Sequence, residues 1–294
     1  MHSIAIDKIM NLDFWSSRVS PDPLSGGITN ANFVVADAGK KYFVRVGDDI
    51  PLHGVMRFNE LAASKAAHAA GISPEVIFNA PGVMVLQFID GKTFTPADVR
   101  KPNNLTRIIE LVRKCHHTIP DYLRGPALVF WPFQIVRDYA NTLSDRKDHM
   151  TPELLRLLDI AQVLEKAVGA VDMVFGHNDL LPANFIDDGK RIWLVDWDYA
   201  GFGSPLFDLG GLASNNELSS AQETKLLENY FQKPIDDELR VRYEAMKCAS
   251  LLRESMWSMV SEKYSEIDFD YMAYTQDNLA RFEKAWAGFQ MNSG

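Results

Sequence analysis

The 294-residue chain lacks several features that would place it in a special class of protein. It has only two cysteines, Cys115 and Cys248, which share no close spacing and are expected to be buried or half-buried free thiols. No unbroken apolar run approaches about 18 residues, so no membrane span is expected. The N-terminal stretch MHSIAIDKIMNLDFW carries acidic residues and no long apolar core, which a signal peptide would need. These absences favour the reducing cytoplasm.

The chain also lacks a surplus of positive charge. It carries 30 lysines and arginines against 39 aspartates and glutamates, a formal net charge of −9. Binding to nucleic acid needs basic side chains to neutralise phosphates, so a nucleic-acid partner is not expected. A small anionic ligand remains compatible with this charge, because a locally positive pocket can hold it. The hydrophobic fraction of 47% is ordinary for a globular protein of one large or two joined domains.

The spacing of apolar residues divides the chain into two regions of different character. The first region reads as short strands and one helix, and the second reads mainly as helices with two short strands. The strands of the first region are expected at Ala31–Ala36, Tyr42–Val46, Glu75–Asn79 and Val83–Phe88, and its helix at Arg57–Ala70. The later helices are expected at Leu105–His117, Phe133–Leu143, Pro152–Val168, Ala221–Phe231, Asp236–Ser261 and Tyr271–Phe289, and the strands at Asn184–Ile186 and Ile192–Val195. We therefore expect an α+β protein with an N-terminal lobe over residues 1–89, a connector near Gln87–Gly91, and a C-terminal lobe over residues 90–294.

Polar residues crowd into the segment FGHNDLLPANF between two apolar runs. Its hairpin can bring Asn184 beside Asp196, and an amide oxygen next to a carboxylate suits Mg²⁺. Asp179 lies a few residues upstream, where it could accept a proton from an incoming hydroxyl group. Two other interpretations stay open: a turn closed by polar side chains, and a Zn²⁺ or two-metal hydrolase centre built from His177, Asp179, Asp196 and Asp198.

A second group of residues suits phosphate. In SGGITNANFVV, small residues around Gly27, Thr29 and Asn30 precede a strand, and their backbone N–H and polar groups could face phosphate oxygens. Arg45 follows on the next strand, and Glu60 lies in the first turn of the expected helix. A strand cation paired with a helix carboxylate is the arrangement by which protein kinases hold the α- and β-phosphates.

These motifs together resemble the choline/ethanolamine kinase branch of the aminoglycoside-phosphotransferase-like family, which is related to protein kinases. The resemblance covers about residues 24–286 and is carried by three segments: HNDLLPANF, LVDWDYAGFGSPLFDLGGLASN and SMWSMVSEKYSEIDFDYMAYTQDNLARF. It implies a two-lobed, protein-kinase-like fold, with an antiparallel sheet and one helix in a small nucleotide-binding lobe and a larger, mainly helical lobe for catalysis and acceptor binding.

The resemblance also implies a role for each matching residue. Asp179 would be the catalytic base, and Asn184 and Asp196 would bind Mg²⁺. The ATP-binding residues would be Gly27, Thr29, Asn30, Arg45, Glu60, Gln87 and Ile89, with the last two in the hinge that meets adenine. His177 and Asp208 would support the catalytic loop.

The acceptor pocket would contain Tyr199, Trp257 and Tyr274, whose rings could surround a cation. One residue departs from the choline-kinase pattern, because Glu254 stands where that pattern has a second tryptophan. Glu254 lies one helical turn before Trp257, on the same face. A carboxylate there suits a primary amine, which can donate hydrogen bonds, although Glu254 could instead pair with Arg253 or Lys247 on the surface.

The sequence therefore predicts an ATP- and Mg²⁺-dependent kinase that phosphorylates the hydroxyl group of a small amino alcohol. Choline and ethanolamine are the leading acceptors. Thiamine, a hydroxylated amino acid and an aminoglycoside remain alternatives, as does a catalytically inactive binding protein of kinase fold. A monomer or a homodimer is expected.

Overall fold

The computed structural model describes residues 2–24, 30–144, 150–265, 267 and 269–293. Contacts within the chain group these residues into two compact units, which are described separately. The first unit comprises Met1–Phe94, Thr118–Pro126 and Ala183–Tyr199, and the second comprises Thr95–His117, Ala127–Pro182 and Ala200–Gly294. The predicted boundary after residue 89, between a nucleotide-binding lobe and a lobe for catalysis and acceptor binding, stays a prediction.

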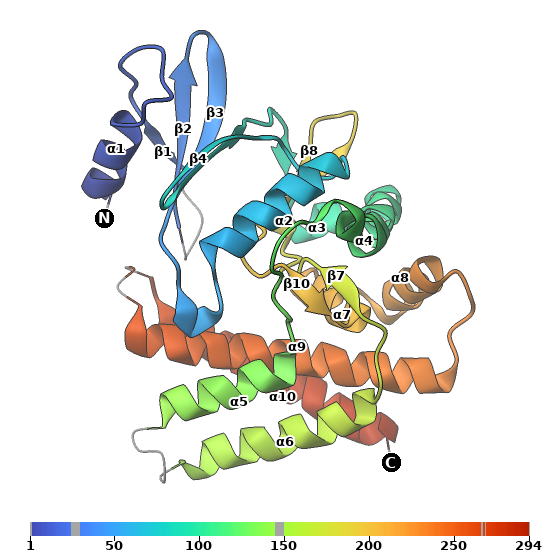
Figure 1. Cartoon of the computed structure of the whole chain (residues 1–294). Coiled ribbons are helices and arrows are strands. Elements are labelled where there is room, and N and C mark those ends of the chain that lie inside the picture. Colours follow the sequence, from blue (N-terminus) through green and yellow to red (C-terminus); the bar gives the residue numbers. More distant parts are fainter. Residues whose placement is uncertain (1, 25–29, 145–149, 266, 268, 294) are drawn as a thin grey trace. The chain divides into compact units, whose positions relative to one another are not determined.

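The first unit is built on an antiparallel sheet of five strands in the order β1-β2-β3-β5-β4 (Figure 1). The strands are β1 (Asp22–Leu24), β2 (Ala31–Asp37), β3 (Lys40–Val46), β4 (Val76–Ala80) and β5 (Val83–Gln87). Phe33 and Val35 alternate with more exposed residues along β2 and are fully buried, as the period of two of a half-buried strand requires. They form a core with Val44 and Val85, and helix α1 (His2–Met10) adds Ile9 to it.

The same unit contains the helix and the hairpin that carry the charged site residues. Helix α2 (Arg57–Ala69) follows the short 3-10 turn η1 (Pro51–His53). A smaller antiparallel sheet orders its strands β6-β8-β9, with bounds Lys92–Thr93, Phe185–Asp187 and Ile192–Leu194, and the 3-10 turn η2 (Pro182–Asn184) leads into β8. Strands β8 and β9 pair with Phe185 opposite Leu194, which confirms the expected hairpin.

The second unit is mainly helical and is organised around one long helix. Helix α9 (Asp237–Tyr264) packs against α5, α6, α7 and α10 (Figure 1). Its helices are α3 (Pro96–Val99), α5 (Pro132–Leu143), α6 (Pro152–Val168), α7 (Pro205–Asn215), α8 (Ser220–Phe231), α9 and α10 (Tyr271–Ser293). Helix α4 (Pro102–Tyr122) belongs to this unit up to His117, and its last five residues belong to the first unit. Its one described sheet pairs the short strands β7 (Val174–Gly176) and β10 (Gly201–Gly203).

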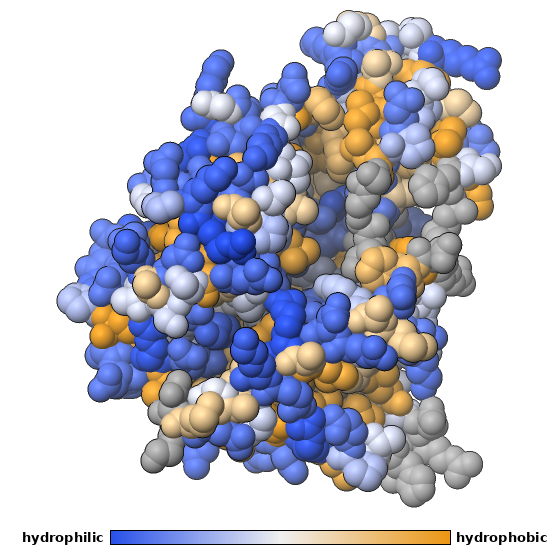
Figure 2. Space-filling view, turned by 180° about the vertical axis from the view of Figure 1, so that it is seen from behind, coloured by the Kyte–Doolittle hydropathy of each residue, from blue (hydrophilic) through white to orange (hydrophobic). Residues whose placement is uncertain are grey.

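Most expected elements are present with bounds shifted by a few residues. Helix α6 matches its expected range, because Thr151 caps its start, accepting from the amide of Leu154 at 3.3 Å, and Gly169 follows its end at a φ of 65°. Helix α7 was not among the expected helices, since Gly210 and Gly211 weaken the helical signal of its sequence. The described part of the chain has no helix both long and apolar enough to cross a membrane. On the face shown in Figure 2, apolar residues lie in patches between hydrophilic ones.

Candidate functional site

The first unit gathers five charged side chains from three segments of its sequence. Arg45 on β3 forms an ion pair with Glu60 on α2, as the resemblance implied. Its guanidinium also lies 2.9 Å from Asp196 and 2.9 Å from Asp198, which follow β9. The Arg45 and Glu60 side chains are only 7% and 3% exposed, so these ion pairs are shielded from solvent.

A second arginine completes this network. Arg57, at the start of α2, lies 2.6 Å from Glu60 and 2.8 Å from Asp198. It also donates to the Asn30 side-chain oxygen at 2.7 Å, and the Asn30 amide donates to Asp198 at 2.8 Å. The predicted residue Asn30 is therefore joined to the ion network by two hydrogen bonds. Gly27 and Thr29 lie outside the described residues.

The two arginines act unequally on the three carboxyl groups. Burial alone would raise the pKa of Asp198, but Arg45, Arg57 and the Asn30 amide outweigh it and hold that pKa below its usual value. For Asp196, burial and the neighbouring Asp198 charge outweigh Arg45 and raise the pKa. Burial also raises the pKa of Glu60 against the pull of the two arginines. Asp198 is thus the one of the three carboxyl groups whose pKa is lowered.

Asn184 and Asp196 lie at one end of the β8–β9 hairpin. Asn184 precedes β8, its carbonyl accepts from the amide of Val195 at 3.0 Å, and Asp196 is the next residue. Asp196 has a φ of 71° and a side chain that is 29% exposed, whereas Asn184 is 7% exposed. One amide and one partly exposed carboxylate provide hard oxygen ligands, so the donor set fits Mg²⁺ held with waters and phosphate oxygens. No cluster of three histidine, cysteine, aspartate or glutamate residues suited to a metal exists in the described part of the chain, so the hydrolase interpretation gains no support there.

The remaining predicted residues of the first unit lie at the end of a strand or in the segments that follow strands. Gln87 ends β5, and its backbone amide donates to the carbonyl of Glu75 at 2.9 Å. Ile89 follows two residues later and is half-buried. Tyr199, the last residue of this unit, is 9% exposed. Within the described part of the chain, the contacts of Gln87, Ile89 and Tyr199 do not identify a ligand for these residues.

In the second unit, Asp208 on α7 holds the loop that follows β7. Its two carboxylate oxygens accept from the backbone amides of His177 at 2.8 Å and Asn178 at 2.7 Å. Asn178 has a φ of 63°, which costs free energy for a residue other than glycine. Burial alone would raise the pKa of Asp208, but hydrogen bonds from His116 and the loop amides outweigh it and lower that pKa. The ionised carboxylate therefore stabilises the strained backbone directly before Asp179.

Glu254 on α9 is not a free surface carboxylate. It lies 2.9 Å from the Arg253 guanidinium and accepts from the Tyr274 hydroxyl at 2.8 Å. Lys247 instead pairs with Glu223 at 2.8 Å and Glu244 at 3.5 Å. The Glu254 side chain is 24% exposed, and the Arg253 side chain is 4% exposed. Of the two pairings expected for Glu254, only that with Arg253 is present, and it lies mostly below the surface.

Glu254 shares a cavity with Asp179. The cavity of about 20 Å³ is also lined by Arg253, Ser250 and Phe207. This volume holds about one water molecule, so an amino alcohol would extend beyond it. The charge of Asp179 also reaches Tyr274, whose pKa is raised by burial first, then by Glu254, with a smaller contribution from Asp179. The predicted base and the carboxylate that departs from the choline-kinase pattern thus face the same space.

Aromatic rings lie next to Glu254. The ring of Trp257 is centred 6.2 Å from that of Tyr271 and 6.3 Å from that of Tyr274. Phe269 contacts both tyrosines, at 5.0 and 5.7 Å. Trp257 is 3% exposed and Phe269 is 41% exposed, so the cluster runs from the core to the surface. Such a group of ring faces can attract an organic cation.

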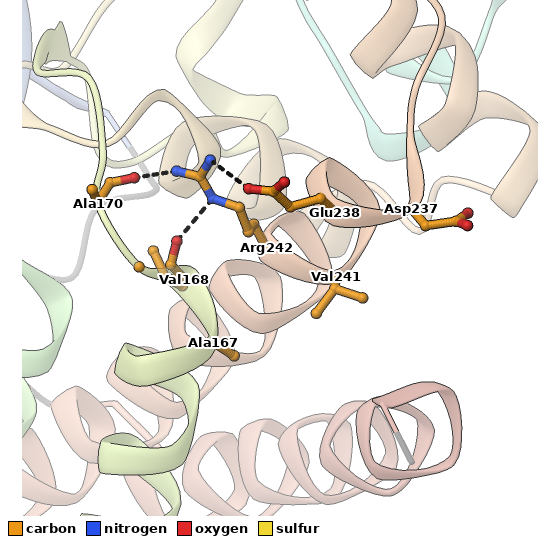
Figure 3. A pocket seen from close by; sticks show the side chains of 8 residues that line it. Ala167, Val168, Ala170, Asp237, Glu238, Val241 and Arg242 are labelled. Carbon is orange, nitrogen blue, oxygen red and sulfur yellow. Dashed lines mark hydrogen bonds and ion pairs between the residues drawn. The ribbon is translucent and has the colours of Figure 1, made fainter.

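A larger cavity, of about 480 Å³, lies at the end of α6 and the start of α9 (Figure 3). Arg242 donates there to the carbonyls of Val168, at 2.9 Å, and Ala170, and lies 3.9 Å from Glu238. None of the predicted site residues lines this cavity, and its other walls are mainly small apolar side chains. Its volume exceeds that of the cavity beside Asp179, and its charged lining consists of Asp237, Glu238 and Arg242.

Three residues of these networks, Arg57, Arg253 and His116, were not predicted as site residues, and Asp198 was considered only as a ligand of the hydrolase centre. Arg57 contacts Glu60, and Arg253 contacts Glu254. Asp198 contacts Arg45, and His116 contacts Asp208. For Arg57 a sequence signal existed, since Arg57 and Glu60 are spaced i, i+3 at a helix start. His116 had no such signal, because its partner Asp208 is distant in the sequence.

Comparison with known proteins places these features in a family. The family model for choline/ethanolamine kinase matches residues 22–224. A probable ethanolamine kinase of Arabidopsis thaliana is 27% identical over 300 residues, which cover 88% of this chain and 77% of that protein. A choline/ethanolamine kinase family protein of Mesorhizobium loti has a similar structure, with a TM-score of 0.76, 26% identity and 99% of both chains covered.

The fold extends beyond close relatives. Choline kinase LicA of Streptococcus pneumoniae superimposes with a TM-score of 0.78 at 24% identity, over 98% of this chain and 99% of that one. The expected α+β, protein-kinase-like fold is therefore confirmed. A kinase of this fold uses ATP as its phosphoryl donor. From the match over residues 22–224, the chain belongs to the choline/ethanolamine kinase family of small-molecule kinases.

Proposed function

We propose that this chain transfers the γ-phosphate of ATP to the hydroxyl group of a small primary amino alcohol, with ethanolamine favoured over choline. The observation that carries the choice of acceptor is that Asp179 and Glu254 line one cavity. A carboxylate accepts hydrogen bonds from a primary ammonium group, whereas a trimethylammonium group has no N–H to donate. The aromatic cluster around Trp257 and Tyr274 adds ring faces for the same cation.

The nucleotide half of the reaction is assigned to the charged network. Arg45, oriented by Glu60, is proposed to hold the ATP phosphates, with Asn30 and the loop containing Gly27 and Thr29 beside them. Gln87 and Ile89 are proposed to meet adenine through their backbone. In this proposal residues 1–89 bind the nucleotide and residues 90–294 carry catalysis and acceptor binding.

Asn184 and Asp196 are the residues that would hold Mg²⁺. When bound, the ion neutralises charge on the phosphate oxygens. Asp179 accepts the proton of the acceptor hydroxyl as the oxygen attacks phosphorus. His177 and Asp208 hold the loop that presents Asp179. The backbone amides of His177 and Asn178 donate hydrogen bonds to the Asp208 carboxylate.

The first experiment tests the base. Asp179→Ala is expected to abolish ADP release with every acceptor while leaving ATP affinity unchanged, because the base acts on the acceptor and not on the nucleotide. Coupled ADP-release kinetics and equilibrium nucleotide binding measure the two effects. Asp172→Ala is the matched control, since Asp172 is exposed and lies two residues before β7. Near-normal turnover by Asp179→Ala would contradict the assignment.

The second experiment tests the acceptor. The panel comprises ethanolamine, choline, thiamine, hydroxylated amino acids and an aminoglycoside, and ethanolamine is expected to give the highest kcat/KM. Glu254→Gln is expected to lower kcat/KM for ethanolamine by about 10- to 100-fold, the loss of one charge-assisted hydrogen bond, and to change the value for choline less. Glu254→Trp, which restores the aromatic side chain of the choline-kinase pattern, is expected to shift preference toward choline.

Glu262→Gln is the matched control for the acceptor experiment, because Glu262 is an exposed glutamate on the same helix α9. A wild-type preference for choline over every primary amine would contradict the role of Glu254. Nucleotide binding without ADP release on any acceptor would favour a catalytically inactive binding protein. The expected monomer or homodimer and the cytoplasmic location stay predictions.

A further inference from the structure

A buried chain of side chains extends from the Asp208 carboxylate to the distant helix α8. The Nε2 atom of His116, on α4, lies 2.9 Å from the Asp208 Oδ2 atom. The Nδ1 atom of the same ring lies 2.6 Å from the hydroxyl oxygen of Tyr230, on α8. His116, Asp208 and Tyr230 are 1%, 2% and 5% exposed. Four segments of the second unit thus meet through these side chains: α4, α7, α8 and the loop after β7.

The hydrogen-bond roles follow from the partners. An ionised carboxylate only accepts, so Nε2 of His116 carries the hydrogen that is shared with Asp208. The Nδ1 atom shares its hydrogen bond with the Tyr230 hydroxyl. Burial, followed by the Asp208 charge, raises the pKa of Tyr230, so its hydroxyl stays protonated. The His116 ring is therefore held between the Asp208 carboxylate and the Tyr230 hydroxyl.

Three hydrogen bonds hold the orientation of the Asp208 carboxylate. Its Oδ1 atom accepts from the Asn178 amide at 2.7 Å, and its Oδ2 atom accepts from the His177 amide at 2.8 Å. His116 donates to the same Oδ2 atom, so it adds a side-chain bond to the orientation that the two amides require. The bond from His116 also helps to keep the buried carboxyl group ionised.

The backbone that these bonds hold is strained. Asn178 is left-handed, with a φ of 63°, and it directly precedes Asp179. Such a conformation costs free energy and persists only where the surroundings enforce it. The neighbouring Gly176 leaves room for this arrangement, because a Cβ atom there would lie 2.7 Å from the Asn178 side-chain oxygen and 3.2 Å from Asp208.

We infer that His116 and Tyr230 are positioning residues for catalysis: they orient the Asp208 carboxylate, which in turn holds the strained His177–Asn178 backbone so that Asp179 is presented to the acceptor hydroxyl. This inference rests on the proposed role of Asp179 as the base. It assigns no contact between substrate and either His116 or Tyr230.

The kinetic test compares kcat with KM. His116→Ala is expected to lower kcat by up to about 100-fold, the usual scale for a misplacement of about 1 Å at the reacting group. KM for ATP is expected to stay unchanged, because the nucleotide residues belong to the other unit. Tyr230→Phe keeps the ring and removes the hydroxyl, so kcat is expected to fall less. His116→Gln, whose amide can donate to Asp208, is expected to recover part of the lost kcat.

His117→Gln is the matched control, since His117 is the next residue on α4 and is exposed. It is expected to leave kcat unchanged. Equal losses of kcat in His116→Gln, His116→Ala and His117→Gln would overturn the inference, as would a wild-type kcat for His116→Ala. A rise in KM for ATP that matches the fall in kcat would indicate general loss of structure and would also overturn it.

A second readout does not depend on activity. Hydrogen exchange of the His177 and Asn178 backbone amides reports whether Asp208 still holds the loop. Exchange at these amides is expected to accelerate in His116→Ala and Tyr230→Phe, and to stay at the wild-type rate in His117→Gln. Unchanged exchange in His116→Ala would overturn the inference even if the protein proved not to be a kinase. An inactive wild-type protein with accelerated exchange in His116→Ala would overturn the proposed function alone.

Discussion

At the scale of single residues, Arg45 illustrates how one side chain can serve several carboxylates. Its guanidinium group contacts Glu60, Asp196 and Asp198 through its two terminal nitrogens. A lysine presents one compact charge and could not reach all three carboxylates in this fixed geometry. The arginine therefore links the sheet, helix α2 and the β8–β9 hairpin of the first unit, in addition to its proposed contact with phosphate.

Arg45→Met should show the strength of this link. Removal of the cation leaves Glu60 and Asp198 to share Arg57 and leaves Asp196 without its ion pair. Breaking a buried ion pair by removing one partner costs about 3–5 kcal/mol, and we expect the free energy of unfolding to fall by that amount. Denaturant unfolding followed by circular dichroism measures the change.

Lys41→Met provides the control for Arg45→Met, because Lys41 is an exposed cation on the same strand β3. It is expected to change the free energy of unfolding by less than about 0.5 kcal/mol. If Arg45→Met unfolds at the same denaturant concentration as Lys41→Met, the network stabilises the fold no more than a surface charge does.

Some of these residue contacts could be predicted from the sequence and others could not. The pairing of Arg45 with Glu60 follows from a strand cation and a helix carboxylate, and the structure shows that contact. The hydrogen bond from His116 to Asp208 joins residues 92 positions apart, and no local pattern signals it. The catalytic, metal and acceptor roles of the site residues stay predictions, since they concern molecules that bind to the protein.

At the scale of elements, α7 depends on a close approach to α9. A Cβ atom on Gly210 would lie 2.8 Å from the Lys247 Cα atom and 3.1 Å from the Lys247 nitrogen. These are backbone atoms of a long helix and cannot move aside easily. Glycine at this position allows α7, which carries Asp208, to pack directly on α9.

Gly210→Ala is therefore expected to destabilise the protein. The forced separation of the two helices should cost about 1–3 kcal/mol, as overpacking of a core does. The neighbouring Gly211→Ala is the control, because the nearest atom to its Cβ would be the Ser250 hydroxyl oxygen at 4.0 Å. That change should be neutral or stabilise the protein by up to about 1 kcal/mol, since alanine favours helix. Equal midpoints of thermal unfolding for the two variants would contradict the close packing.

Gly210 and Gly211 also explain why the sequence pattern does not predict helix α7. Helix α6 has a capping threonine, a proline at its first position and a glycine after its end, all of which are local signals. Helix α7 has a capping serine and a first-turn proline too, but Gly210 and Gly211 in its middle oppose a helix. Its tertiary packing on α9 overrides that local preference. Strands β7 and β10 have three residues each, too few for a recognisable alternation.

At the scale of the whole molecule, the first unit is discontinuous in sequence. Residues 183–199 belong to it together with residues 1–94, although about ninety positions separate the two segments. Trp197 donates from its indole nitrogen to the Ser73 hydroxyl at 2.7 Å, and the Leu194 amide donates to the Ile72 carbonyl at 3.2 Å. Periodicity is a local property, so the sequence pattern predicts consecutive lobes and cannot predict that a later hairpin returns to the first unit.

This return leads to a prediction about fragments of the chain. A fragment of residues 1–94 lacks Asp196 and Asp198, so Arg45 and Arg57 would keep only Glu60 as a carboxylate partner of this network. We expect it to lack a cooperative unfolding transition and to give a poorly dispersed amide NMR spectrum. The same fragment joined through glycine-serine linkers to residues 118–126 and 183–199, the other two segments of the first unit, should recover both properties.

Asp198→Ala in the fused fragment tests whether folding is restored by the ion network or only by the added length of chain. Asp198 lies 2.9 Å from Arg45 and 2.8 Å from Arg57, and it accepts from Asn30, so its loss removes the carboxylate shared by both arginines. We expect this variant to lose cooperative unfolding, whereas Lys190→Ala, at an exposed position in the turn of the same hairpin, should retain it. A well-dispersed spectrum from residues 1–94 alone would show that the first unit folds without the hairpin. The ion network would then serve ligand binding and not the stability of the fold.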